Sequence, residues 1–292
     1  MANLGQLISE KNAADSQWRE QRQMERDSIT AIQGAGVIQI TSDPAAYARY
    51  LTMQGDNPTY SPGNIALVME QMPTATVFGP QERWRSLGRT VNASEVNMGV
   101  SIFARSTNGK GYSMAPAYDI SQTTGRDMRT FRLTDDSKEM ETALRILMNY
   151  SPVPVVSNQE IETPAFYDQR NLMLAINPDY SDSEAFAAIA AEIAHARFHD
   201  RGRNGDYHRG ESDLDAQSVS FILCRRFGVK RDLPDLSKLP ELYQDWPVES
   251  RRDILDGIQD MSKMIGSSIE KEITPAQRTI PVTRRPPRPA TR

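Results

Sequence analysis

Two strongly apolar helical segments, residues 183–199 and 214–227, constrain the fold of this chain most. Helices as apolar as these must be buried against other elements rather than lie on a surface. Three short strand candidates precede them, at residues 152–156, 165–167 and 172–176. The second half of the chain is therefore predicted to be a mainly helical unit with a small sheet.

The three histidines of the chain, His195, His199 and His208, all lie at or soon after the end of the first apolar helix. The segment Ala191-Glu192-x-x-His195 has the spacing of the H-E-x-x-H helix of metallopeptidases. In that arrangement two histidines one turn apart bind zinc, and the glutamate activates the metal-bound water. Here the first histidine position is Ala191, whose methyl group cannot bind a metal. Glu192 is the candidate catalytic residue, as a general base.

Three interpretations of this segment remain open. In the first, the helix belongs to a metallopeptidase-like fold that has lost its zinc and its catalysis. In the second, His195 and His199 share one helix face and bind zinc together with Asp215 or His208, with Glu192 as the base. In the third, the histidines are surface residues without a metal. The candidate metal ligands are thus His195, His199 and Asp215, and the expected cofactor is none, or zinc in the rearranged site.

The first half of the chain predicts a mixed α+β region. A long, sparsely apolar helix is expected from Leu4 to the turn at Gly34–Gly36, either as a solvated arm or as an oligomerisation helix, followed by a strand at 37–40. Asp43-Pro44 has the composition of a helix start. Residues 100–105 and 112–120 are predicted to pair as a hairpin around the turn Asn108–Gly111.

Positive charge is concentrated in part of this first region. Residues 83–132 contain eight basic and three acidic side chains, although the whole chain has 34 basic and 38 acidic residues. Binding of single-stranded nucleic acid needs cations for the phosphates and flat rings on which bases stack. The residues that could supply them are Arg83, Trp84, Arg85, Arg89, Phe103, Arg105, Lys110, Tyr112, Arg126, Arg129 and Arg132. The alternative is that Trp84 belongs to the core and that the arginines form an ordinary solvated surface.

Several short motifs resemble those of a known family. They are Tyr60-Ser-x-x-Asn64, Ala75-Thr-x-x-x-Gly79, Trp84 followed by Leu87-Gly-Arg89, and Tyr118-Asp-Ile-Ser-Gln-Thr123. In order and spacing they resemble the single-stranded-DNA-binding domain of ArdC-type antirestriction proteins and of LtrC-like proteins of conjugative elements. The segment from Ala191 to His199 and the one around Asp215 and Gln217 resemble the zincin-like domain that accompanies it. The resemblance adds Tyr60 and Asn64 to the DNA-binding candidates, although Asn64 could equally cap its helix.

The expected organisation is a helical arm (1–40), a single-stranded-DNA-binding-like domain (41–134), a degenerate zincin-like domain (135–272) and a disordered tail (273–292). Residues 274–292 contain five prolines, five arginines and no acidic residue. Without the tail the chain has 29 basic against 38 acidic residues. The tail could therefore attract phosphates or dock on a protein partner.

The expected function is that of a single-stranded-DNA-binding accessory protein of a conjugative element, whose metallopeptidase-like domain is inactive. The expected partners are single-stranded DNA and a protein bound through the C-terminal domain or the tail. The alternative function is a zinc-dependent peptidase or hydrolase with a rearranged ligand set. The apolar runs are shorter than the ~20 residues that a membrane span needs, and no secretory signal is recognised, so a cytoplasmic location is expected.

Overall fold

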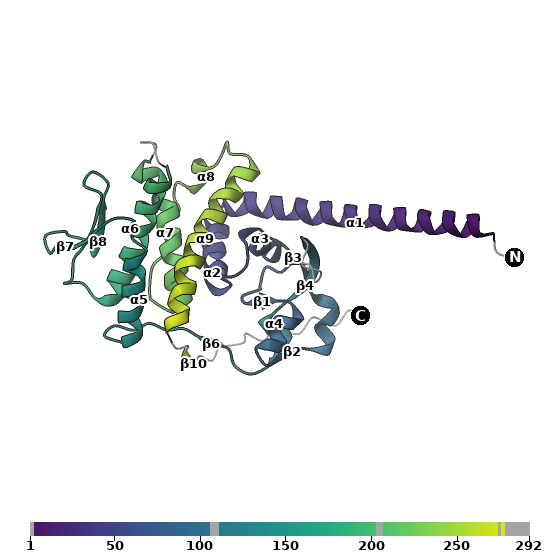
Figure 1. The fold of residues 1–292 in the computed structure, drawn as a ribbon, viewed down its shortest axis with the longest axis horizontal. Helices are drawn as coiled ribbons and strands as arrows, with labels where there is room; N and C mark the ends of the chain where they lie inside the picture. Colours follow the sequence, from purple (N-terminus) through teal and green to yellow (C-terminus); the bar gives the residue numbers. More distant parts are fainter. Residues whose placement is uncertain (1–2, 106–110, 203–206, 274–275, 278–292) are drawn as a thin grey trace, which may run out of the picture.

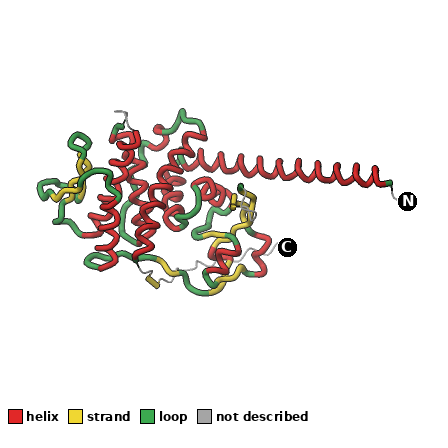
Figure 2. The backbone as a smooth tube through the Cα atoms, viewed as in Figure 1, coloured by secondary structure: helices red, strands yellow, loops and turns green. Residues whose placement is uncertain are grey.

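The computed structural model describes residues 3–105, 111–202, 207–273 and 276–277. The predicted α+β class is confirmed, with helices dominant and several small sheets. Figure 2 shows strands on two sides of a central group of helices. The helices are α1 (Leu4–Ile40), α2 (Pro44–Asp56), α3 (Pro62–Gln71), α4 (Gln81–Ser86), α5 (Lys138–Asn149), α6 (Asp182–Gly202), α7 (Arg209–Phe227), α8 (Leu239–Leu242) and α9 (Val248–Glu272), with 3-10 turns η1 (Ala93–Met98) and η2 (Ile120–Gln122).

In the described part of the chain the strands form four small sheets. The first has the order β1-β4-β3, the second pairs β2 with β5, the third pairs β6 with β10, and the fourth has the order β7-β9-β8. Among the strand pairings of the described residues, only that of β7 with β9 is parallel. The bounds are β1 (Phe78–Gly79), β2 (Arg89–Val91), β3 (Val100–Arg105), β4 (Tyr112–Asp119), β5 (Thr123–Gly125), β6 (Arg129–Thr130), β7 (Val155–Ser157), β8 (Ala165–Asp168), β9 (Met173–Ile176) and β10 (Ala276–Gln277). The predicted hairpin is the β3–β4 pair, in register from Val100 with Ala117 to Arg105 with Tyr112.

Helix α1 extends away from the rest of the molecule toward the N-terminus (Figure 1). The strand predicted at 37–40 is wrong, because the helix continues through Gly34 and Gly36 to Ile40. A Cβ on Gly36 would lie 3.1 Å from the Cβ of Ala66, so the missing side chain lets α1 pack closely on α3. Val37 and Ile40, one helical turn apart, are then buried in the core.

The apolar helices α6 and α7 pack against each other, and α7 also packs against α2 and α9. Helix α2 begins as predicted, with the Asp43 side chain accepting a hydrogen bond from the amide of Ala45 and Pro44 in the first turn. Helix α7 ends at Gly228, which has a left-handed φ of 66°. Among the described residues, no helix is long and apolar enough to cross a membrane.

The larger apolar core includes residues from both sides of position 134. It contains Tyr47 and Tyr50 of α2 together with Phe186 of α6 and Phe227 of α7. A smaller cluster forms around Trp84 beneath β2, β4 and η2. Of the tail predicted to begin at residue 273, only residues 273, 276 and 277 lie within the described part of the chain, and the last two pair with β6.

Candidate nucleic-acid interface and the histidine centre

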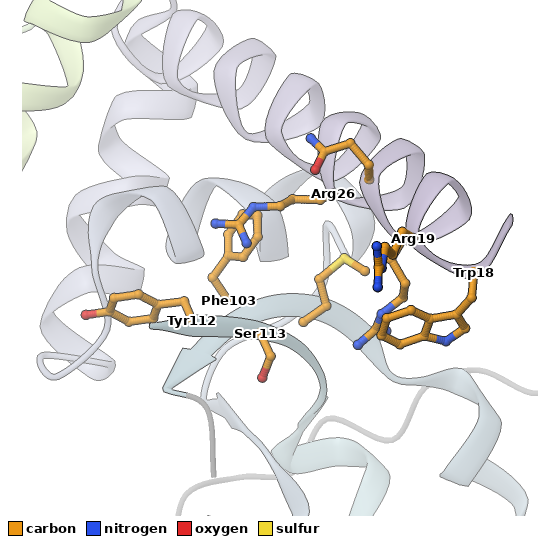
Figure 3. A pocket seen from close by; sticks show the side chains of 9 residues that line it. Trp18, Arg19, Arg26, Phe103, Tyr112 and Ser113 are labelled. Carbon is orange, nitrogen blue, oxygen red and sulfur yellow. The ribbon is translucent and has the colours of Figure 1, made fainter. Parts of the chain in front are cut away.

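A groove of about 320 Å³ lies between α1 and the β3–β4 hairpin. We call it the arm groove (Figure 3). Its helical side carries an aromatic ring and three cations at positions that share one helix face, and its strand side carries two more rings. The lining residues are Trp18, Arg19, Arg22, Gln23 and Arg26 of α1, and Phe103, Tyr112, Ser113 and Met114 of the hairpin.

The cations of the arm groove lie beside its rings. The Arg26 guanidinium is 5.9 Å from the centre of the Phe103 ring, and Figure 3 shows the one above the other. The Arg22 guanidinium is 5.4 Å from the centre of the Trp18 ring. Trp18 and Tyr112 are 62% and 61% exposed, so both rings are open to a ligand. The groove therefore offers flat surfaces and positive charge in one place.

Little of this charge is neutralised. Arg22 approaches Glu25 at 4.0 Å in an exposed pair, which in water is worth little. Arg19 and Arg26 form no salt bridge with any acidic residue in the described part of the chain. An anion entering the groove would thus meet two unpaired guanidinium groups and one weakly paired one.

Of the DNA-binding residues predicted from the sequence, Phe103 and Tyr112 line the arm groove, whereas Trp84 and Arg89 do not. Trp84 is fully buried, with its indole N–H donating to the carbonyl of Tyr118, so its ring cannot stack on a base in this structure. Arg89 is also buried and donates to Thr123 and to the carbonyl of Arg126. The burial and the internal hydrogen bonds of these two side chains favour a structural role, the alternative that the sequence left open for Trp84.

Asn64 does not face solvent either. Its side-chain amide donates to the carbonyl of Phe103 at 2.8 Å and accepts from the amide of Phe103 at 2.9 Å. It therefore fixes α3 to strand β3, close to the arm groove, and is not itself open to a ligand.

Tyr60 and Arg83 form a separate contact. The Arg83 guanidinium lies 5.3 Å from the centre of the Tyr60 ring and donates to the carbonyl of Phe78. Arg85, Arg105 and Arg126 are exposed. Arg105 pairs in register with Tyr112, which places it next to the arm groove, whereas Lys110 lies outside the described residues.

Sequence reasoning missed the α1 side of the groove. Trp18, Arg22 and Arg26 are four residues apart and therefore lie on one helix face. That spacing of one aromatic and two cations was the available signal. It was overlooked because the sparse apolar residues of the segment predicted only a solvated arm or an oligomerisation helix.

A cluster of polar side chains surrounds Glu192 on α6. We call it the histidine centre, and its members are Tyr167, Glu192, His195, His199, Tyr207 and Arg209. Glu192 is 6% exposed. Both of its oxygens accept from the Arg209 guanidinium, at 2.5 and 2.9 Å, and one also accepts from the backbone amide of Tyr167 at 2.7 Å. The carboxylate that the sequence assigned as a general base is thus held by three donors.

His195 is completely buried and uses both ring nitrogens. Nε2 lies 3.3 Å from Asp213 Oδ1, and Nδ1 lies 2.8 Å from the Tyr207 hydroxyl. Because an ionised carboxylate can only accept, Nε2 carries the proton and Nδ1 accepts from Tyr207. Burial lowers the pKa of His195, and the positive charge of Arg209 lowers it further.

His199 lies one turn further along α6, within the same centre. Its Nδ1 is 2.7 Å from the Tyr167 hydroxyl, and its ring stacks on Tyr207 with 4.9 Å between the ring centres. Burial raises the pKa of Tyr167, so this phenol stays protonated and can donate.

Asp215 is not brought to the histidines. Its carboxylate accepts from the Tyr243 hydroxyl at 3.0 Å, and burial raises its pKa to about 7. His208 directly precedes α7. Among the described residues, no group of three or more His, Cys, Asp or Glu side chains is arranged to hold a metal ion. The two histidines and Asp215 therefore do not form a ligand set in this structure.

No model of a known protein family matches this chain, and no curated protein matches it. Two solved structures of the antirestriction protein ArdC from plasmid R388 are similar to it. The Mn(II)-bound structure has 14% identity and a TM-score of 0.48, and the alignment covers 82% of this chain and 97% of that one. The metal-free structure has 15% identity and a TM-score of 0.41, with 73% and 84% covered.

Proposed function

We propose that this chain binds single-stranded DNA in the arm groove, as an antirestriction-type accessory protein of a conjugative element. The observation that carries the DNA-binding part is the groove itself, where Arg19, Arg22 and Arg26 face the hairpin beside exposed Trp18 and Tyr112. The accessory role rests on the sequence motifs that resemble ArdC-type proteins.

The chemistry of the arm groove favours a single strand over a duplex. Base stacking on Trp18 or Tyr112 requires bases whose faces are free, and in a duplex those faces are already stacked on each other. The guanidinium groups supply contacts to the phosphates, which give affinity without sequence preference. We therefore assign a sequence-tolerant single-strand site.

We infer that the second half of the chain serves as a scaffold or as a contact surface for a protein partner. A peptidase would need Glu192 free to take a proton from water, and its two bonds to Arg209 and the one to Tyr167 oppose this. No specific observation favours the alternative of a zinc-dependent hydrolase with Glu192 as its base.

The test is a titration of labelled oligo(dT) with the full chain between 50 and 200 mM salt. Replacing Trp18 by Ala removes a stacking surface worth about 1–3 kcal/mol and should weaken binding roughly 5- to 150-fold, whereas Trp18→Phe should retain most of the affinity. The logarithm of the binding constant falls linearly with the logarithm of the salt concentration, by about 0.7 per phosphate contact. Replacing Arg19, Arg22 and Arg26 together by Ala should make this slope less steep by about 2.

Two controls separate the groove from other sources of binding. Arg145→Ala removes an exposed cation on α5 and should leave the affinity unchanged. A chain ending at Ile273 lacks the basic tail and should still bind. If the groove variants bind like the wild type, or if only the full-length chain binds, the proposed site is wrong.

A further inference from the structure

We propose that the Arg209 guanidinium is the built-in counter-cation of Glu192, so that the histidine centre is a closed ion pair that takes up no divalent metal. This inference is independent of DNA binding in the arm groove. It concerns α6, α7 and β8, where the sequence has the spacing of an H-E-x-x-H helix with Ala191 in place of the first histidine.

The first step of the argument is charge. A carboxylate as buried as Glu192 is unfavourable unless a cation and further donors satisfy its oxygens. Arg209 reaches both oxygens with two separate N–H groups, the bidentate geometry that suits a guanidinium. The third donor is the amide of Tyr167 on β8. The negative charge of Glu192 is therefore compensated from within the chain.

The second step is the fixed position of Arg209. Its guanidinium lies 5.1 Å from the centre of the Phe166 ring, and its side chain is 34% exposed. Phe166 and Tyr167 are neighbours on β8, so a single strand supplies both the ring beside the cation and the amide that binds Glu192. Partial burial opposes the charge of Arg209, but the bonds to Glu192 outweigh it and raise the pKa of this guanidinium, so the cation persists at any ordinary pH.

The third step is that the remaining groups do not fit a metal ion. Ala191 has no donor atom, and both nitrogens of His195 are engaged by Asp213 and Tyr207. Nδ1 of His199 is engaged by the Tyr167 hydroxyl. Asp215 bonds to Tyr243 instead. A divalent cation would have to displace Arg209 and would gain too few ligands in return, since zinc sites take at least three protein ligands.

The test combines a double-mutant cycle with metal measurements on the full chain. Arg209→Met leaves Glu192 buried and uncompensated, and should lower the melting temperature at pH 7 by roughly 10 °C. Glu192→Gln should also lower it. The melting temperature of the double variant should fall by much less than the sum of the decreases in the two single variants, because neither charge is left without a partner.

The exposed pair Arg145–Glu141 is the matched control. Its nitrogen and oxygen are also 2.5 Å apart, but both side chains are more than two-thirds exposed. The corresponding Met and Gln variants should show almost no coupling. A coupling in the Arg209 cycle no larger than in this control would overturn the proposal.

Metal measurements on the wild type test whether the histidine centre binds a divalent ion even if a single variant fails to fold. The wild type, purified without chelator, should contain no stoichiometric zinc or manganese by elemental analysis. Its melting temperature should not change when EDTA, Zn(II) or Mn(II) is added. Stoichiometric metal, or a rise in melting temperature with either ion, would show that Arg209 does not exclude metal.

Discussion

Asp215 shows how one partly buried carboxyl makes stability depend on pH. Its side chain accepts from the Tyr243 hydroxyl, and burial raises its pKa from 3.8 to about 7. Between these two values the folded state keeps a proton that the unfolded chain releases. The contribution of Asp215 to stability is therefore complete below about pH 4 and is lost as the pH rises to 7 and above.

Asp215→Asn should remove this dependence, because its amide oxygen can still accept from Tyr243 and does not titrate. We expect the variant to unfold at a higher temperature than the wild type at pH 8, with a gain of at most about 4 kcal/mol, at about 1.4 kcal/mol per pKa unit. The two proteins should converge near pH 4. Thermal unfolding from pH 4 to 8 checks this, and parallel curves for both proteins would contradict it.

At the residue scale, the sequence predicted which side chains belong to the candidate site better than it predicted what each of them does there. Glu192 and His195 were selected by their spacing, and both lie in the histidine centre. The role of Arg209 could not be inferred, because the bond joins residues from two helices whose packing no local pattern specifies. Trp84 shows the same limit, since aromatic composition does not distinguish a core ring from a binding surface.

At the scale of elements, two amide side chains on α3 protect the free edge of strand β3. In the order β1-β4-β3 this strand pairs on one side only. Asn64 exchanges two hydrogen bonds with the backbone of Phe103, and Gln71 does the same with Ser101. The two amides occupy backbone groups that would otherwise be open to another chain.

Asn64→Ala and Gln71→Ala should each reduce the free energy of unfolding by about 1–3 kcal/mol, because each leaves a backbone N–H and C=O without partners. Urea denaturation measures this loss. The double variant should also self-associate more strongly in sedimentation, since the edge of β3 is then free to pair. Gln6→Ala, in an exposed bond on α1, is the control and should be neutral. A neutral double variant would show that the edge is protected in another way.

The ends of helices were predicted correctly where a capping residue marks them in the sequence. They were missed where contacts with other helices determine how far a helix continues. The caps at Asp43 and Gly228 were read correctly because a side chain or a left-handed backbone fixes them within a few residues. The segment 37–40 was misread as a strand because its apolar run is too short to reveal helical periodicity. Gly34 and Gly36, just before it, indicated a turn, but Gly36 permits a close helix contact instead.

At the scale of the whole molecule, helix α2 belongs to the same packed body as α7. The Tyr47 hydroxyl lies 2.9 Å from the Ser218 hydroxyl, and Arg225 donates to both oxygens of Asp56 at 2.8 and 2.9 Å. Tyr47, Tyr50 and Leu51 are fully buried in the core that they share with α6 and α7. The larger core thus contains residues from both sides of the division predicted at residue 134.

A fragment of residues 41–134 should therefore fail to fold alone, because α2 would expose the side chains that it buries against α7. We expect poor dispersion of its amide proton resonances and no cooperative thermal transition. The chain ending at Ile273 is the control, and it should unfold in one transition near that of the full chain, since it retains every helix of the core. A fragment 41–134 that melts cooperatively would establish an independent domain, and then the contacts between α2 and α7 would be a docking interface rather than part of a shared core.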